Sequence, residues 1–194
     1  MVGDPYQAEN DPACYPGTSI LRNIPDLRDL PELEEFELKM VALRSEEGPP
    51  SGTLDPKHYR AIHRHLFQDV YDWAGDYRTV RTGKGGNWFC YPEYIEKEME
   101  TLFERLGHSE FKPGSDVEHF IASLADFVAD LNAIHPFREG NGRTQLLLIR
   151  LLGQNAGHLF RADAVEADEF LFAMIESFNG KLDALKDELE RMLA

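Results

Sequence analysis

The chain has 194 residues, 42% hydrophobic and 28% charged, which is the composition of one soluble globular domain. Its formal net charge of −15 argues against nucleic acid and anionic membrane surfaces as partners, because both attract proteins through lysine and arginine. With no secretory signal, no apolar run that could cross a bilayer and only Cys14 and Cys90 as thiols, the sequence predicts a cytoplasmic, disulfide-free protein. Export by a signal-less route stays open.

The N-terminal half begins irregularly. Residues 1–31 are rich in proline and are predicted to form no helix. Helices are predicted over residues 32–44 and 58–73, where apolar side chains recur at helical spacing. Asp55 is the expected N-cap of the second helix, and Pro56 its first residue.

The stretch 78–90 has a different pattern. Residues 78–82 alternate in polarity, residues 83–87 are glycine-rich, and residues 88–90 are apolar. This order is typical of two short strands joined by a turn, and it predicts a β-hairpin flap.

The rest of the chain predicts further helices. Residues 144–155 are apolar almost all round, which is typical of a helix at the buried centre of a domain. The other expected helices are 92–106, 116–134, 167–178 and 182–193. We therefore predict an all-α protein with a single domain over residues 1–194 and one hairpin flap.

Histidines on the second helix raise the question of a metal site. His58, His63 and His65 do not have the i, i+4 spacing of a helical zinc site. We expect solvated side chains or ones satisfied in the core.

The loop of residues 135–143 has the groups needed to bind phosphate. Gly140, Asn141 and Gly142 allow positive φ angles and let backbone N–H groups converge on an anion. The start of the following helix adds its uncapped N–H groups and its dipole. Arg143 offers a planar fork for a phosphate group.

The same loop has groups for catalysis. Glu139 is a hard oxygen ligand suited to Mg²⁺, and His135 is the side chain able to take a proton near neutral pH. Phe137 is expected to anchor the loop in the core. A glycine turn or a packed histidine alone would be unremarkable, but five features within nine residues indicate chemistry on a phosphoanhydride.

The stretch His135–Arg143 also resembles the signature of Fic-domain proteins, His-x-Phe-x-Asp/Glu-Gly-Asn-Gly-Arg-x-x-Arg. The resemblance covers nearly the whole chain, including Tyr15–Thr18 near the start and Trp73–Gly75 before the hairpin. It implies an all-helical Fic fold and a bacterial cytoplasmic enzyme. The implied reaction is transfer of AMP from ATP, with Mg²⁺, to a Ser, Thr or Tyr hydroxyl of a target protein.

The resemblance also implies residue roles. His135 is the general base and Glu139 the Mg²⁺ ligand. The implied ATP-binding residues lie in the loop and the flap: Lys84, Gly85, Gly140, Asn141, Gly142 and Arg143. Through Trp88 and Phe89 the flap is expected to align a target segment by strand-like pairing.

One position departs from the family signature. Leu146 stands where the family has a second arginine, which in relatives contacts the terminal phosphate of ATP. Moreover, no Ser or Thr here is followed four positions later by Glu, as in the inhibitory helices of the family. If the protein is inhibited, a separate antitoxin-like partner is required, and with Leu146 the glutamate of such a partner would lack its counter-charge.

Two alternatives follow from Leu146. Doc-type protein kinases also lack the second arginine and transfer the terminal phosphate, but they have lysine where this chain has Gly142. The other alternative is a Fic-fold binding protein that has lost turnover, which the intact His135 and Glu139 oppose.

Overall fold

The computed structural model describes residues 11–84, 86–161 and 165–193, and it confirms the all-α class. The helices of these ranges are α1 (Leu30–Glu46), α2 (Pro56–Phe67), α3 (Ile95–Glu104), α4 (Val117–Ile134), α5 (Asn141–Ala156), α6 (Ala167–Phe178) and α7 (Asp183–Met192). Short 3-10 helices cover Pro92–Tyr94, Arg105–Gly107 and Ser109–Phe111. The flap is an antiparallel pair, β1 (Gly83–Lys84) and β2 (Asn87–Trp88).

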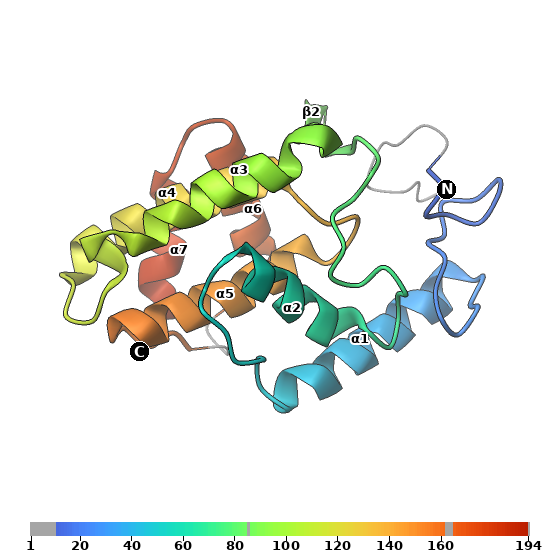
Figure 1. Ribbon diagram of the computed structural model, residues 1–194, viewed down its shortest axis with the longest axis horizontal. Helices are drawn as coiled ribbons and strands as arrows, with labels where there is room; N and C mark the ends of the chain where they lie inside the picture. Colours follow the sequence, from blue (N-terminus) through green and yellow to red (C-terminus); the bar gives the residue numbers. More distant parts are fainter. Residues whose placement is uncertain (1–10, 85, 162–164, 194) are drawn as a thin grey trace.

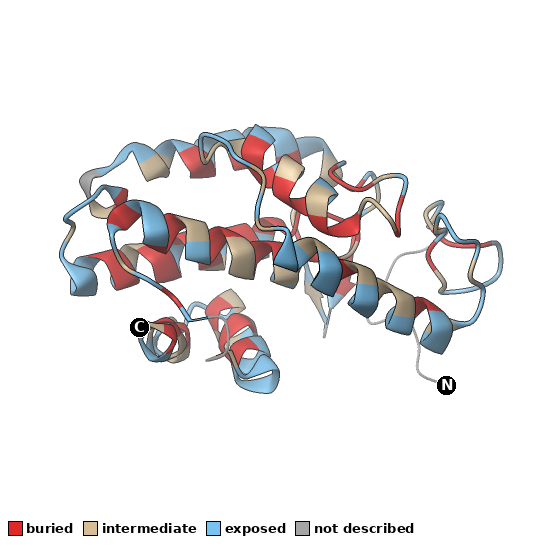
Figure 2. Cartoon of the chain, turned by 90° about the horizontal axis from the view of Figure 1, so that it is seen from below, coloured by how far each residue is buried: buried red, intermediate tan, exposed pale blue. Residues whose placement is uncertain are grey.

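The helices surround one core (Figure 1). α1 packs beside α2 and α3 beside α4, while α5 contacts both α2 and α4. α6 and α7 pack together and against α4. Figure 2 shows that the buried residues of these helices face one another and the exposed ones face outward.

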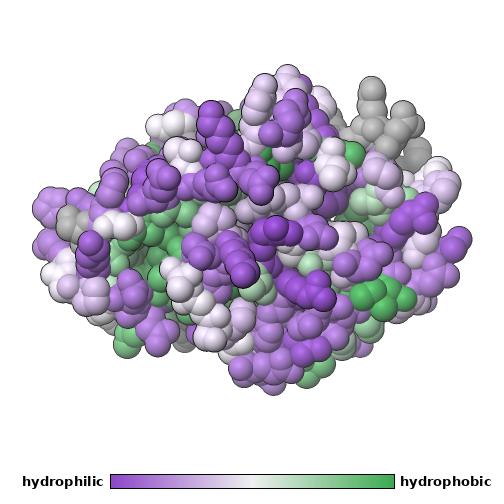
Figure 3. All heavy atoms as spheres, in the orientation of Figure 1, coloured by the Kyte–Doolittle hydropathy of each residue, from purple (hydrophilic) through white to green (hydrophobic). Residues whose placement is uncertain are grey.

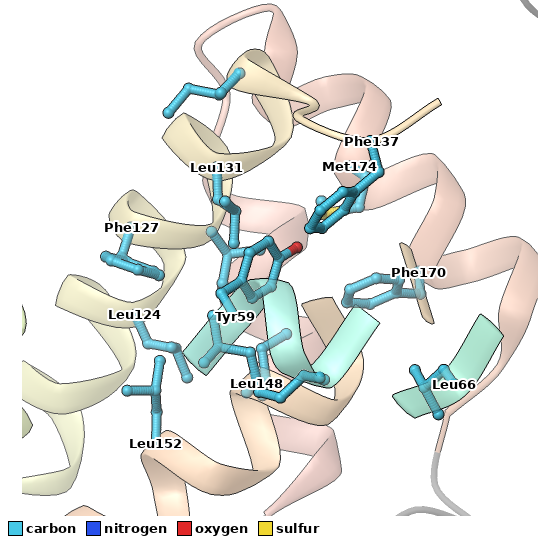
Figure 4. Close-up of a cluster of buried hydrophobic side chains, with 14 of the residues drawn as sticks. Tyr59, Leu66, Leu124, Phe127, Leu131, Phe137, Leu148, Leu152, Phe170 and Met174 are labelled. Atoms are coloured by element: carbon cyan, nitrogen blue, oxygen red, sulfur yellow. The ribbon is translucent and has the colours of Figure 1, made fainter. Parts of the chain in front are cut away.

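The centre of the core draws on four helices and the 135–143 loop (Figure 4). Tyr59 of α2 points toward Phe137 of the loop, and both side chains are fully buried. Around them lie apolar side chains of α4, α5 and α6: Leu124, Phe127, Leu131, Leu148, Leu152, Phe170 and Met174. The loop is thus held by the same apolar packing that stabilises the domain.

Local signals explain where the helices begin. The side chain of Asp29 accepts a hydrogen bond at the start of α1, and those of Asp55 and Asp116 do so for α2 and α4. Such a cap stabilises a helix by about 1 kcal/mol. The N-cap predicted at Asp55 is confirmed. Residues 11–29 contain no helix, as predicted, but α1 begins at Leu30, inside the stretch 1–31 predicted to be irregular, and residues 1–10 lie outside the described residues.

α2 is shorter than predicted, because it ends at Phe67 and not near residue 73. The carbonyl of Val70 accepts a hydrogen bond from the N–H of Ile24, at 2.8 Å. That carbonyl is therefore used by the N-terminal stretch and not by a further helical turn.

The flap strands are also shorter than predicted, and residues 78–82 are not a strand. Arg78 is buried and its guanidinium binds backbone carbonyls, so this arm folds inward. On the other arm the N–H of Cys90 donates to the carbonyl of Ala133, at 3.1 Å, beside the end of α4. Tertiary hydrogen bonds thus replace the outer part of the predicted ladder.

α5 is not buried all round, contrary to the prediction. Leu148, Ile149 and Leu152 are buried, but Leu146 is half-buried and Arg150 is exposed. The half-buried side lines a cavity, which explains why an apolar residue there is not enclosed by protein.

The surface agrees with the composition. Figure 3 shows a face that is mostly hydrophilic with smaller apolar patches. Within the described ranges no helix is long and apolar enough to cross a bilayer.

Candidate active site

The loop between α4 and α5 has two left-handed residues at its ends. His135 ends α4 with φ of 49°, and Gly140 precedes α5 with φ of 79°. Between them Phe137 is fully buried, which confirms its expected anchoring role. The two left-handed residues thus turn the chain at each end of the loop, and the buried Phe137 anchors the loop between them.

Hydrogen bonds within the loop fix its shape. The side chain of Asn141 accepts from the N–H of Phe137 at 3.0 Å and donates to its carbonyl at 2.8 Å. The hydroxyl of Thr144 donates to the carbonyl of Gly140 at 2.8 Å. No side chain caps α5, so N–H groups of its first turn are left for a ligand.

His135 faces a cavity and is almost fully enclosed. Its ring is stacked on that of Phe89, with centroids 3.8 Å apart and planes 6° apart. Burial lowers the pKa of His135 to about 3, and the nearby charges of Arg78 and Lys84 act in the same direction. The imidazole is therefore neutral at pH 7 and has a nitrogen able to take up a proton.

Arg78 holds this end of the site together, and sequence analysis missed it. Its Nε donates to the carbonyl of His135 at 2.8 Å, and one terminal nitrogen donates to the carbonyls of Ile134 and Cys90 at 3.1 and 2.6 Å. The other terminal nitrogen binds the carbonyl of Val80 at 2.8 Å. A positive charge on the last carbonyls of α4 is favourable, and here Arg78 also joins both flap arms to the 135–143 loop.

His63 of α2 packs against the loop and binds its backbone. The N–H of Gly75 donates to its Nδ1 at 2.8 Å, so its Nε2 carries the proton and donates to the carbonyl of Glu139 at 2.9 Å. Its ring stacks on Phe137, with centroids 3.8 Å apart. Burial lowers the pKa of His63 to about 4. It is a satisfied core histidine, as expected.

Glu139 is placed to hold a cation beside a ligand. Its Oε1 accepts from the N–H of Gly140 at 2.8 Å and lies 3.4 Å from a terminal nitrogen of Arg143. Its Oε2 has no hydrogen-bond partner among the described residues, and Glu139 lines the cavity. Burial, together with the charge of Glu37, raises the pKa of Glu139.

This arrangement fits Mg²⁺ held jointly by protein and ligand. The described residues contain no group of three His, Cys, Asp or Glu that could hold a metal on its own. Mg²⁺ is commonly bound through one or two carboxylates plus substrate phosphates, so a single available carboxylate oxygen suits it.

The cavity has a volume of about 400 Å³ and two chemically different walls. Its polar wall comes from the flap, the loop and the start of α5: Lys84, Asn87, His135, Glu139, Gly140, Gly142, Arg143 and Gln145. Its apolar wall comes mainly from α6: Ala167, Phe170, Leu171, Met174, Ile175 and Phe178. Leu146 also lines it. Such a cavity suits a ligand with a charged end and a flat apolar end.

The structure brings together most of the predicted site residues. Trp88 is one exception, because its side chain is 47% exposed and does not line the cavity; the guanidinium of Arg81 lies over its ring. Asn141 is the other, because its side chain is turned toward Phe137. Asn141 offers a ligand only its backbone. Phe89 is buried against His135, and Gly85 lies outside the described residues.

Comparison with known proteins gives a consistent result. The profile of the Fic/DOC family matches residues 53–153. The probable protein adenylyltransferase y4lH of Sinorhizobium fredii is 51% identical over 189 residues, which cover 97% of this chain and 98% of that protein. The probable protein adenylyltransferase Fic of Escherichia coli is 35% identical over 188 residues, covering 95% and 93%.

A solved structure agrees with these relatives. The BepC protein of Bartonella tribocorum, a VirB-translocated effector crystallised with bound AMPPNP, superposes with a TM-score of 0.85. The two chains are 27% identical, and the match covers 94% of this chain and 96% of that one.

Proposed function

This chain belongs to the Fic/DOC family, and on that premise we propose that it is a protein adenylyltransferase, which transfers AMP from ATP to a hydroxyl side chain of a target protein. One observation carries the proposal. A buried, neutral His135 and the uncapped first turn of α5 line the same cavity as the apolar side chains of α6.

The two walls suggest how ATP lies. The phosphates are bound at the first turn of α5, by its N–H groups and by Arg143, where the helix dipole favours an anion. The adenine packs on the apolar side chains of α6, such as Phe170 and Met174. Lys84 of the flap lines the same cavity and adds a positive charge for the phosphates.

The reaction is a displacement at the α-phosphorus. His135 takes the proton from the hydroxyl of a Ser, Thr or Tyr of the target as the oxygen attacks. The bond between the α-phosphorus and the bridging oxygen of the pyrophosphate breaks, and pyrophosphate leaves with the electron pair. The products are an AMP-modified side chain, pyrophosphate and a proton on His135.

Mg²⁺ belongs at Glu139, where it would neutralise charge on the leaving pyrophosphate when bound. The N–H of Gly140 keeps the carboxylate of Glu139 oriented, at 2.8 Å, with its Oε2 left toward the ligand. The protein thus contributes one fixed oxygen ligand, and the ATP phosphates contribute others.

ATP also changes the electrostatic environment of His135, the proposed base. Burial and the positive charges of Arg78 and Lys84 lower the pKa of His135 in the free protein. The negative phosphates offset those two charges when they enter the cavity, so protonation of His135 becomes easier in the complex. Proton uptake by His135 is therefore more favourable in the complex than in the free protein.

The target is expected to reach the base along the flap. Among the described residues β1 and β2 pair only with each other, so an extended segment of the target can add to an outer edge of this pair. Trp88 is exposed beside this edge and Phe89 stacks on His135. We assign positioning of the target to these flap residues.

Control of the activity is proposed to come from outside these 194 residues. They contain no Ser/Thr-x-x-x-Glu arrangement that would supply an inhibitory glutamate. We therefore propose a separate antitoxin-like inhibitor and action in a bacterial cytoplasm.

The test is the mass added to a target. The protein is incubated with ATP, Mg²⁺ and a bacterial lysate, and modified peptides are identified by mass spectrometry, with His135→Asn as the inactive control. Asn is chosen because it tolerates the left-handed backbone of position 135 better than most residues. AMP on Ser, Thr or Tyr, lost in the control, is the expected result. A phosphate in its place would show the kinase reaction of Doc-type relatives, and no modification would indicate a binding protein.

A further inference from the structure

Glu37 of α1 is joined to the site, although it lies more than 100 positions before Arg143 in the chain. Its Oε1 accepts a hydrogen bond from a terminal nitrogen of Arg143, at 2.6 Å. Its Oε2 accepts from the hydroxyl of Tyr71, at 2.5 Å. The side chain of Glu37 is only 12% exposed, so water screens this ion pair weakly.

Arg143 is fixed from two directions. Its guanidinium lies over the ring of Phe67, with its central carbon 4.7 Å from the ring centroid. One terminal nitrogen is held by Glu37 at 2.6 Å and lies 3.4 Å from Glu139. The ring sets the plane of the guanidinium and the carboxylate sets its rotation.

The contact leaves the other donors of Arg143 available. Among the described residues, no hydrogen bond is made by its Nε or by its second terminal nitrogen, and Arg143 lines the cavity. A carboxylate that neutralised Arg143 in competition with phosphate would be expected to bind two nitrogens in the fork geometry. Glu37 binds one, so its contact is compatible with phosphate binding.

We propose that Glu37 is a positioning residue for the nucleotide, acting through Arg143; this rests on the proposed function. Arginine side chains lose considerable rotamer freedom when they bind a ligand in one geometry. In this protein the side chain is ordered on folding by Glu37, Tyr71 and Phe67, so less freedom is lost when ATP binds. Tyr71 has a supporting role, because it holds the second oxygen of Glu37.

The test measures nucleotide binding without any target, by calorimetric titration of ATP and of AMP into the full chain with Mg²⁺. Glu37→Gln keeps the shape but removes the charge, and we expect it to weaken ATP binding by about 3- to 10-fold while AMP binding changes little. Tyr71→Phe should weaken ATP binding in the same direction by less. The matched control is Glu35→Gln on the same helix, since the side chain of Glu35 is 68% exposed and pairs with Lys39.

A double-mutant cycle identifies the route of the effect. If Glu37 acts through Arg143, the weakening caused by Glu37→Gln should disappear in an Arg143→Ala background. Equal weakening of ATP and AMP, additivity with Arg143→Ala, or tighter ATP binding by Glu37→Gln would each overturn the proposal. Wild-type protein that binds ATP but modifies no protein would count against the transferase reaction and leave the assignment of Glu37 intact. A wild-type protein that binds no ATP would overturn both.

Discussion

Gly140 lies against the ring of Phe67 so closely that a β-carbon on Gly140 would be 2.3 Å from the Cζ of Phe67. Its φ of 79° is also one that other residues rarely adopt. We therefore expect Gly140→Ala to lower the free energy of unfolding by about 2–4 kcal/mol, from backbone strain and overpacking together. Urea denaturation of the two proteins measures this.

Gly142 is the matched control, because a β-carbon there would meet nothing within 4 Å. It lies in the first turn of α5, where alanine is the better helix former. Gly142→Ala should leave stability unchanged or raise it by up to about 1 kcal/mol. Equal destabilisation by both substitutions would mean that the packing of Gly140 on Phe67 is not the cause.

Leu146 lines the proposed nucleotide cavity and is half-buried, so arginine at this position has a route to solvent and ligand. We expect Leu146→Arg to strengthen ATP binding more than ADP binding, because a guanidinium there adds a charge-assisted contact of roughly 1.5–3 kcal/mol to the terminal phosphate. Parallel titrations with both nucleotides and a thermal melt check this. A protein that melts at lower temperature without gaining a preference for ATP would mean that Leu146 is a packing residue.

Glu139→Gln tests the metal site. In the wild type the N–H of Gly140 donates to Glu139 at 2.8 Å, and the amide oxygen of glutamine can still accept this hydrogen bond. The charge that attracts Mg²⁺ is lost. We expect AMP transfer to fall and the Mg²⁺ concentration needed for half-maximal transfer to rise. The role assigned to Glu139 does not survive if transfer is the same in both proteins and insensitive to a chelator.

The pH dependence of stability should reflect two of the buried histidines, His63 and His135. The folded state lowers the pKa of His63 to about 4 and that of His135 to about 3, from an ordinary value of 6.5. Between pH 6.5 and those values the unfolded chain binds more protons, so stability falls as the pH falls. For His63 the loss at pH 5 is about 2 kcal/mol relative to neutral pH.

Urea denaturation at pH 7 and pH 5 measures the loss, with His63→Gln as the comparison. Glutamine does not titrate, so the variant should lose less stability than the wild type over this interval. An identical loss would show that His63 does not bind protons differently in the two states.

The sequence predicted which residues of the loop lie together at the candidate site, but not which residues hold the loop in place. His135, Glu139 and Arg143 lie within nine positions, so local spacing was enough to bring them together. Glu37 and Arg78 reach the same loop from distant parts of the chain, and no local pattern indicates such contacts. In the sequence, each of these two residues is one charged residue among many.

The same dependence on distant contacts explains why the end of α2 and the length of the flap strands were predicted wrongly. Helix existence was predictable because apolar spacing and caps are local signals. The end of α2 and the extent of the flap depend on hydrogen bonds with residues far along the chain, such as that between Cys90 and Ala133. Those competing bonds are formed only in the folded protein.

The four carbonyls bound by Arg78 have a consequence for which hydroxyl is modified. They tie both arms of the flap to His135, the proposed base, so the separation between a docked strand and His135 is set in advance. Along such a strand the neighbouring side chains point to the opposite face, and the next ones on the same face are about 6.6 Å away. One residue of a bound segment comes into reach at a time. A target with several adjacent serines would accordingly be labelled at one of them, and inserting one residue between the docking sequence and that serine would abolish its modification.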